Sequence, residues 1–237
     1  MNYYHGTARE RGVKAIKLKK LPISQGDDHW LGDGVYFYDN IKYAYRWIWM
    51  MCEDRIKKNP SKAVLLDNYM VIVANINIVE GRLWDLVHNP EHFLIFNELR
   101  TEILKKNNQG SEMKKRVTVK KIVDGVVLNI LFNEYGFGEE FDAVLYSFRT
   151  KSSSASLKTR IDIHEIQLCV KNPEIITGLC ECTNYNHHDN IQFIYAYNNY
   201  KKGARKNDKN KNDIGRKSSL YQRIFKQDAS GRIQSDA

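Results

Sequence analysis

The chain has 237 residues, of which 42% are hydrophobic and 27% charged, a balance that is typical of a folded globular protein and excludes a largely disordered one. No apolar run approaches the roughly 20 residues needed to cross a bilayer, and the N-terminus lacks a secretion signal pattern, so we expect a cytoplasmic protein with no membrane partner. The net charge is +9, but residues 201–237 hold eleven Lys or Arg against four Asp, which leaves +2 for residues 1–200. We therefore expect one domain at 1–200 and a basic, flexible tail at 201–237.

The first part of the chain predicts two short strands and one amphipathic helix. Residues 2–7, "NYYHGT", and residues 34–38, "GVYFY", are aromatic and β-prone, which is typical of strands. Apolar residues recur at helical spacing over 41–58. The Asp-Asn pair at 39–40 can cap the start of this helix, and Pro60 stops it.

The rest of the chain predicts further strands on either side of a helical middle. We expect helices at 90–106 and 113–135, and strands at 69–79, 141–148, 163–170 and 191–197. A polar, Ser-rich segment at 149–160 is typical of an exposed loop. Because strands dominate the two ends and helices the middle, the sequence predicts an α+β fold.

The four cysteines favour neither a disulfide framework nor a metal site. In a cytosolic chain they are expected to stay reduced. Cys180 and Cys182 precede His187 and His188, but a single residue separates the cysteines, whereas zinc sites usually have two to four. We therefore expect no bound metal.

Alternation along 163–170 places two polar side chains on one face of a strand. Ile166 and Leu168 point to a core, and Glu165 and Gln167 lie on the opposite face, about 7 Å apart. Alone this pattern is compatible with a solvated face. Its interest comes from its combination with the two strands at the start of the chain.

Three segments together resemble the NAD-dependent ADP-ribosyltransferases of the diphtheria-toxin and poly(ADP-ribose) polymerase branch: "YHGT" at 4–7, "GVYFY" at 34–38, and "EIQLCV" at 165–170 after the polar loop. That branch uses a His from a first strand, a Tyr from a G-x-Y-F-like strand and a Glu from a later strand. The resemblance covers roughly residues 1–60 and 140–176. It implies a split antiparallel β-sandwich with NAD between two facing sheets, peripheral helices and a helical insertion at about 90–135.

The resemblance also implies a role for each matching residue. His5 would bind a ribose hydroxyl of NAD, Gly6 would offer its backbone to the nicotinamide amide, and Thr7 would help hold a ribose. Tyr36 would stack on the nicotinamide ring, whose cationic form is attracted to electron-rich rings. A second ring from the following helix would close the sandwich, with three candidates: Trp47, Tyr43 and Tyr45. His29 and Trp30 are compatible with a flap over the cofactor or with a plain turn.

The chain departs from this family at the catalytic glutamate. Aligning "QLCV" on the family's E-x-x-V pattern puts Gln167 at that position, and Glu165 stands two residues earlier on the same face. Cleavage of NAD leaves positive charge on the ribose, as in glycoside cleavage, and a carboxylate stabilises that charge. We favour Glu165 as the acting group with Gln167 assisting. The alternatives are catalysis through Gln167 itself and loss of activity.

The family resemblance predicts a mono-ADP-ribosyltransferase that acts on a macromolecule. The loop before the later strand touches the acceptor in related enzymes, and here it holds four cations and no acid, which favours RNA or DNA over protein. These cations are Arg149, Lys151, Lys158 and Arg160. By analogy, the protein would be a growth-arresting toxin of a toxin–antitoxin or anti-phage system, with an antitoxin as partner. The alternatives are an NAD-dependent RNA 2′-phosphotransferase and an inactive RNA- or protein-binding module.

Overall fold

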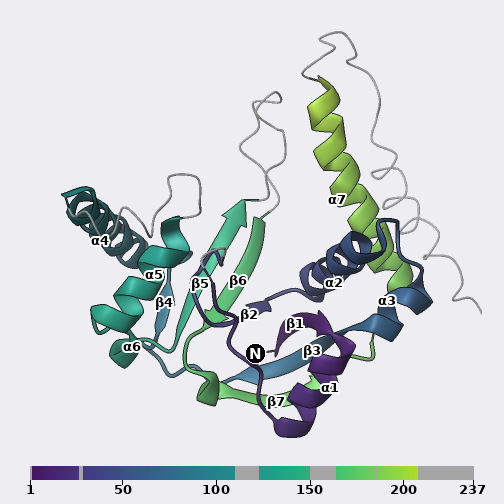
Figure 1. The fold of residues 1–237 in the computed structure, drawn as a ribbon, viewed down its shortest axis with the longest axis horizontal. Coiled ribbons are helices and arrows are strands. Elements are labelled where there is room, and N and C mark those ends of the chain that lie inside the picture. The colour runs from purple at the N-terminus through teal and green to yellow at the C-terminus, as the bar shows by residue number, and fades with distance from the viewer. Residues whose placement is uncertain (1, 27–28, 110–122, 150–163, 185, 208–237) are drawn as a thin grey trace, which may run out of the picture. The chain divides into compact units, whose positions relative to one another are not determined.

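In the part of the chain that the structure describes, seven strands form one mixed sheet in the order β4-β5-β6-β2-β1-β3-β7 (Figure 1). The structure is a computed structural model and describes residues 2–26, 29–109, 123–149, 164–184 and 186–207. The strands are β1 (Asn2–Ala8), β2 (Val35–Tyr38), β3 (Tyr69–Ile76), β4 (Leu83–Asp85), β5 (Ala143–Arg149), β6 (His164–Val170) and β7 (Ile176–Glu181). The helices are α1 (Arg9–Leu18), α2 (Ile41–Ile56), α3 (Lys62–Asn68), α4 (Pro90–Gln109), α5 (Val123–Glu134), α6 (Phe137–Glu140) and α7 (His187–Asn207), with a 3₁₀ turn at Pro173–Ile175.

The sheet consists of two halves that meet at a single residue pair. Every neighbouring pair of strands is antiparallel except β4 and β5. β1 pairs with β3 along its full length, from Asn2 to Ala8, but it pairs with β2 only through Tyr4 and Tyr38. The structure confirms a mixed α and β fold with peripheral helices. Its strands form one continuous sheet, and the β1–β2 boundary is the narrow joint within it.

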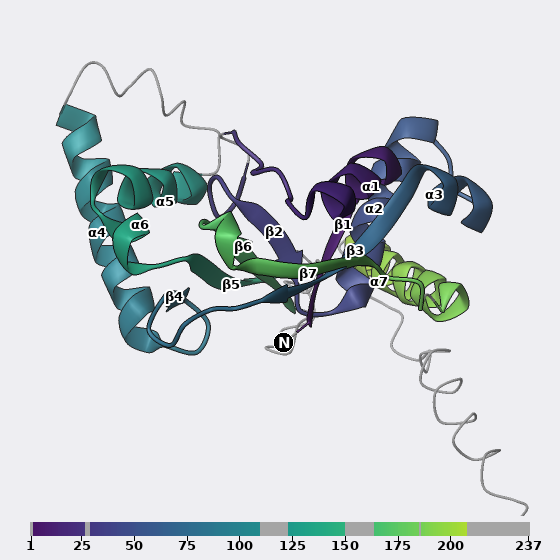
Figure 2. The same ribbon diagram turned by 90° about the horizontal axis from the view of Figure 1, so that it is seen from below.

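Both faces of the sheet are buried by helices. One face carries Phe37, Ile72 and Leu168 and packs against α1, whose Gly12 lies directly on a methionine of β3. The other face carries Trp84 and Cys169 and packs against α4, α5 and α6 at the β4–β5 end. α2 covers β1 and β3 at the other end of the sheet (Figure 2). On this second face, the part formed by β2 and β6 therefore lies between α4, α5 and α6 at one end and α2 at the other.

The helix after β2 begins where the sequence predicts. The Asn40 side chain accepts a hydrogen bond from the Lys42 N–H at 2.9 Å, which satisfies one of the free donors at the helix start. The helix ends at Ile56, and the next residue, Lys57, has a positive φ of 56°. Its buried residues, among them Ala44 and Ile48, follow the helical spacing read from the sequence.

The predicted strand at 191–197 is wrong, because these residues belong to α7. The Asn186 side chain caps this helix by accepting from the Asp189 N–H and donating to the Asp189 carboxylate. Phe193 and Tyr197, four residues apart, bring their rings to 5.9 Å, a contact that a helix allows and a strand does not. Aromatic content favoured a strand, but the cap and the helical spacing decide the local structure.

The chain divides into two compact units. Met1–Arg149 and His164–Asn190 form the first, and the described part of the second is residues 191–207 of α7. The predicted basic tail at 201–237 begins within α7, and beyond residue 207 it lies outside the described residues. Within the described ranges, no helix combines the length and apolar character that spanning a membrane requires.

Candidate functional site

β6 presents Glu165 and Gln167 on one face at the centre of the sheet, as the alternation predicts. Gln167 lies opposite Tyr38 of β2 on one side and opposite Tyr146 of β5 on the other. Glu165 lies opposite Phe148 of β5. Because paired residues of neighbouring strands share a face, the two polar side chains are surrounded by aromatic rings.

Glu165 is buried and held by two partners. It is 4% exposed and forms an ion pair with Arg46 of α2, whose side chain is 11% exposed. The Gln167 amide donates to the other carboxylate oxygen at 2.8 Å. A carboxylate at this depth needs such partners, since an unpaired buried charge is strongly unfavourable. We call Arg46, Glu165 and Gln167 the Glu165 cluster.

A second carboxyl group, that of Asp39, lies near the Glu165 cluster at the start of α2. Burial raises the pKa of Asp39, hydrogen bonds from its own N–H and that of Asn40 lower it, and the negative charge of Glu165 raises it further. The negative charge of Glu165 therefore acts on Asp39, which is exposed just after the end of β2. Arg46 is the cation that offsets this charge in the ion pair.

Gly6 allows α2 to approach β1 closely. A Cβ atom on Gly6 would lie 2.7 Å from the Ala44 carbonyl oxygen and 3.2 Å from the indole of Trp47. The absence of a side chain at Gly6 thus has a packing reason within the protein. As a result the Trp47 ring lies beside Gly6, and it is 42% exposed.

The other two aromatic candidates of α2 have partners elsewhere. The Tyr43 hydroxyl donates to the His164 carbonyl at 2.7 Å, which ties α2 to the start of β6. Tyr45 is fully buried, and its hydroxyl hydrogen-bonds with Nδ1 of His187. Of the three rings, only that of Trp47 combines exposure with a position beside Gly6.

His5 and Tyr36 lie side by side, but their side chains occupy opposite faces of the sheet. Nδ1 of His5 donates to the Tyr36 carbonyl at 2.7 Å, and the His5 ring lies 5.7 Å from that of Phe37. Phe37 and Tyr36 are consecutive strand residues and therefore point to opposite faces. Thr7 follows His5 on its face by the same alternation.

The hydrogen bond to Tyr36 fixes the proton of the neutral His5 ring. A carbonyl oxygen only accepts, so Nδ1 carries the hydrogen and Nε2 is left as an acceptor. Burial lowers the pKa of His5 and thus favours this neutral form, although the bond to Tyr36 partly offsets the shift. An acceptor nitrogen of this kind suits a ribose hydroxyl.

The Tyr36 side chain is engaged by the turn that precedes β2. Its hydroxyl donates to the Gly32 carbonyl at 2.6 Å and accepts from the Leu31 N–H at 2.9 Å. The ring lies 5.5 Å from that of His29, and burial raises the pKa of Tyr36 well above its ordinary value. Tyr36 therefore anchors the 31–33 turn, whatever else its ring contacts.

The glycines of "LGDG" serve the packing of this turn. Gly32 has a φ of +72°, and a Cβ atom there would overlap the Asn129 amide of α5. A Cβ atom on Gly34 would overlap the Cys169 sulfur of β6. These glycines let the 31–33 turn fit between α5 and β6.

The four predicted acceptor-binding cations fall at the edge of the described residues or beyond it. Arg149 ends β5 opposite His164. Lys151, Lys158 and Arg160 lie outside the described residues.

The cysteine-histidine segment is described except for residue 185. Cys180 is exposed on β7 and Cys182 is buried just after it. In the described part of the chain, no group of three or more His, Cys, Asp or Glu side chains is placed to hold a metal ion.

Sequence comparison places the chain beside an archaeal relative. The two are 33% identical over 199 residues, which cover 76% of this chain and 86% of the relative, the uncharacterized protein MJ0359 of Methanocaldococcus jannaschii. This chain belongs to the same family. No protein-family model matches it, and no solved structure shows a significant match. The name of the relative assigns no activity.

Sequence reasoning missed Arg46, which completes the Glu165 cluster. Arg46 lies three residues after Tyr43 on α2, and both residues contact β6. This shared helical face is the signal that would have found it. The Trp30 ring packs 4.6 Å from that of Phe148 on β5.

Proposed function

We propose that the protein is a mono-ADP-ribosyltransferase that transfers ADP-ribose from NAD to a macromolecule. The observation that carries this proposal is the Glu165 cluster, which joins β6 to α2. It combines a buried carboxylate with an amide donor, next to the strand that carries Tyr36 and below the helix that carries Trp47. A carboxylate with fixed partners on a rigid strand suits the stabilisation of a sugar cation.

In the proposed reaction, the bond between nicotinamide and C1′ of the ribose breaks, and its electron pair leaves with neutral nicotinamide. The C1′ carbon then carries positive charge until an acceptor oxygen or nitrogen bonds to it and loses its proton to solvent. Glu165 would stabilise the positive charge, and the Gln167 amide would orient Glu165 through their 2.8 Å hydrogen bond. Gln167 would act as a positioning residue in this scheme.

NAD would lie along the joint between β1 and β2. This boundary has one residue pair, so we propose that the two halves of the sheet correspond to the two sheets of a split sandwich. Gly6 would come from β1 on the face that carries the Glu165 cluster. The side chains of His5 and Thr7 point to the other face, so Nε2 of His5 would accept from a ribose hydroxyl where β1 and β2 separate beyond the Tyr4–Tyr38 pair. Trp47 is our choice for the ring that stacks on nicotinamide, because it lies beside Gly6 and is partly exposed.

The acceptor in this proposal is RNA or DNA. Support comes from the charge of the chain: residues 201–237 carry eleven Lys or Arg against four Asp, and Arg149 leads into a segment with three further cations. By analogy with the toxins of toxin–antitoxin and anti-phage systems, we propose that the protein is a growth-arresting toxin in the cytoplasm and that an antitoxin protein neutralises it. Expression of the active chain should then arrest growth.

A binding module without catalysis is the second candidate, and the Arg46 ion pair favours it. Arg46 neutralises Glu165, and the pair is nearly inaccessible to solvent, with 11% and 5% of the two side chains exposed. A carboxylate neutralised in this way stabilises a sugar cation less. In this case the basic segment after Arg149 and the basic residues of 201–237 would bind nucleic acid, and NAD would stay intact.

An NAD-labelling experiment separates the two candidates. The protein is mixed with NAD labelled in the adenosine part, together with RNA, DNA or protein, and both nicotinamide release and transferred label are measured. Glu165→Gln keeps a hydrogen-bonding side chain beside Arg46 and should lower transfer roughly 10²–10³-fold. The exposed glutamate variant Glu174→Ala is the matched control and should keep full activity.

The outcomes of this experiment are distinct. Loss of transfer in Gln167→Ala with full activity in Glu165→Gln would assign the catalytic role to Gln167. Tight nucleic-acid binding without nicotinamide release in any mixture would overturn the enzyme and support the binding module.

A further inference from the structure

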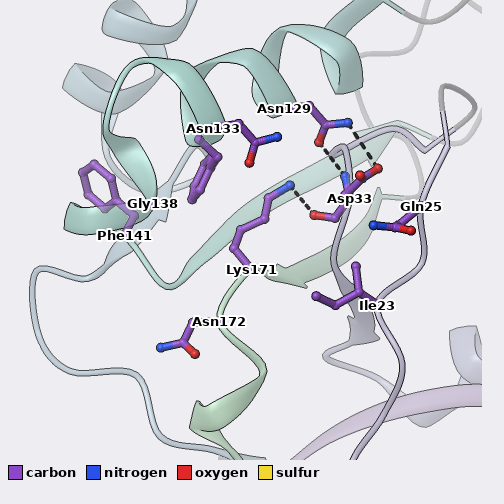
Figure 3. Close-up of a pocket in the computed structure, with 10 residues that line it drawn as sticks. Ile23, Gln25, Asp33, Asn129, Asn133, Gly138, Phe141, Lys171 and Asn172 are labelled. Carbon is purple, nitrogen blue, oxygen red and sulfur yellow. Dashed lines mark hydrogen bonds between the residues drawn. The ribbon is translucent and has the colours of Figure 1, made fainter.

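A polar pocket of about 290 Å³ lies beside Asp33 of the 31–33 turn (Figure 3). It is formed by the segment before β2, by α5, and by the residues that follow β6. Its lining consists of Ile23, Gln25, Asp33, Asn129, Phe132, Asn133, Gly138, Phe141, Lys171 and Asn172. None of these residues belongs to the site predicted from the sequence, so the pocket is a separate feature.

Lys171 places a partly buried amine in this pocket. Its amine donates to the carbonyls of Leu31 and Asp33, each at 2.6 Å, and lies 5.1 Å from the centre of the Phe132 ring. In the described part of the chain, no carboxylate comes within ion-pair distance of this amine. An ammonium has three N–H groups. Two are taken by these carbonyls, and the third lies beside the weak acceptor Sγ of Cys169, which a ligand carboxylate can replace. Burial lowers the pKa of Lys171, and a bound anion would counteract that shift.

The neighbouring side chains leave further donors at the rim. The amides of Gln25 and Asn133 are exposed and make no hydrogen bond with another described residue. Figure 3 shows the Asn133 amide turned toward the Lys171 amine. Asn129 and Asn172, in contrast, are occupied by Asp33 and Asp142.

The remaining lining restricts the kind of ligand. The Asp33 carboxylate accepts from the Gly26 N–H and from Asn129, and its negative charge disfavours a ligand with several charges. Phe132 and Phe141 supply apolar walls. The volume lies at the lower end of the range for small-molecule sites, so the occupant is small.

We propose that this pocket binds a small organic monoanion, a carboxylate attached to a flat apolar body. The carboxylate would accept from the third N–H of Lys171 and from the Asn133 amide, and the apolar body would pack on Phe132 and Phe141. The site does not depend on the proposed transferase activity, because it shares no side chain with the Glu165 cluster.

Benzoate is the probe, and benzamide is its neutral control of the same shape. Isothermal titration of the full-length protein should show saturable benzoate binding at one site, at least tenfold tighter than that of benzamide. Asn133→Asp adds a negative charge at the exposed rim and leaves the bonds of Lys171 intact, so benzoate binding should weaken at least tenfold. Asn97→Asp on α4 makes the same charge change on another exposed surface and should bind benzoate as the wild type does.

Lys171→Met tests the cation directly, with its folding checked by circular dichroism, and a folded variant should lose benzoate binding. Equal binding of benzoate and benzamide, or undiminished benzoate binding by Asn133→Asp, would overturn the proposal. Absence of saturable benzoate binding to the wild type would overturn it as well.

Discussion

Tyr36 and Lys171 hold the same turn from two sides. The Tyr36 hydroxyl accepts from the Leu31 N–H, and the Lys171 amine donates to the Leu31 carbonyl. The turn thus links the candidate site on β2 to the polar pocket behind it. It follows that a variant of Tyr36 changes the packing of this turn as well as any contact with a ligand.

Removing only the Tyr36 hydroxyl should therefore destabilise the protein. In Tyr36→Phe the Leu31 N–H and the Gly32 carbonyl lose their partner, which should lower the free energy of unfolding by about 1–3 kcal/mol. Urea denaturation measures this change. Tyr146→Phe, also on the aromatic face, is the control and should change it by less than about 0.5 kcal/mol. Equal effects of the two variants would contradict the anchoring role.

The buried ion pair should show strong coupling in a double-mutant cycle. Arg46→Met alone leaves Glu165 charged and buried without its cation, and should lower the free energy of unfolding by about 3–5 kcal/mol. Arg46→Met combined with Glu165→Met removes both charges, so it should be more stable than the single variant. Denaturation of the wild type, the two single variants Arg46→Met and Glu165→Met, and the double variant measures the coupling.

An exposed ion pair offers the matched comparison for this cycle. Lys20 and Glu174 are 67% and 81% exposed, so Lys20→Met should change the stability by less than about 1 kcal/mol. Additive effects of the Arg46 and Glu165 substitutions would refute the buried pair.

A methyl group at Gly6 should disturb the contact between β1 and α2. In Gly6→Ala the new Cβ atom would lie 2.7 Å from a backbone oxygen, that of Ala44, so no side-chain rotation relieves the clash. We expect a loss of about 1–3 kcal/mol in unfolding free energy and a shift in the fluorescence of Trp47. Unchanged stability and an unchanged spectrum would show that α2 does not rest on Gly6.

Acid should weaken the fold through His5. Burial holds the pKa of folded His5 below its ordinary value of 6.5, so between these two pKa values the unfolded chain binds more protons than the folded one. The stability that neutral His5 contributes to the folded state is fully present above about pH 6.5 and is lost as the pH falls toward the pKa of His5 in the folded protein.

His5→Asn isolates this effect, since asparagine keeps a donor for the Tyr36 carbonyl but does not titrate. Urea denaturation from pH 7.5 to pH 5 should show the wild type losing stability relative to this variant as the pH falls. A stability difference that stays constant, or that grows in favour of the wild type on acidification, would contradict the lowered pKa.

Much of the local structure could be predicted from short-range patterns. Alternation placed Glu165 and Gln167 on one face of β6, and the polar residue before α2 is its cap. The first two strands, with His5 and Tyr36, also formed as predicted. Patterns of this kind involve residues two to four positions apart, so they can be read from the sequence without knowledge of the tertiary contacts. The same reasoning failed for 191–197, where aromatic content outweighed the cap at Asn186.

The partners of the key side chains were decided only by the tertiary structure. Arg46 meets Glu165 across 119 positions, and the Lys171 amine reaches Leu31 across 140. The glycines before β2 and in β1 fit against helices, although their sequence context suggested a ligand. Composition and spacing determine which face a residue occupies. The side chain across from it depends on strand register and helix packing, which are set by burial of the whole core.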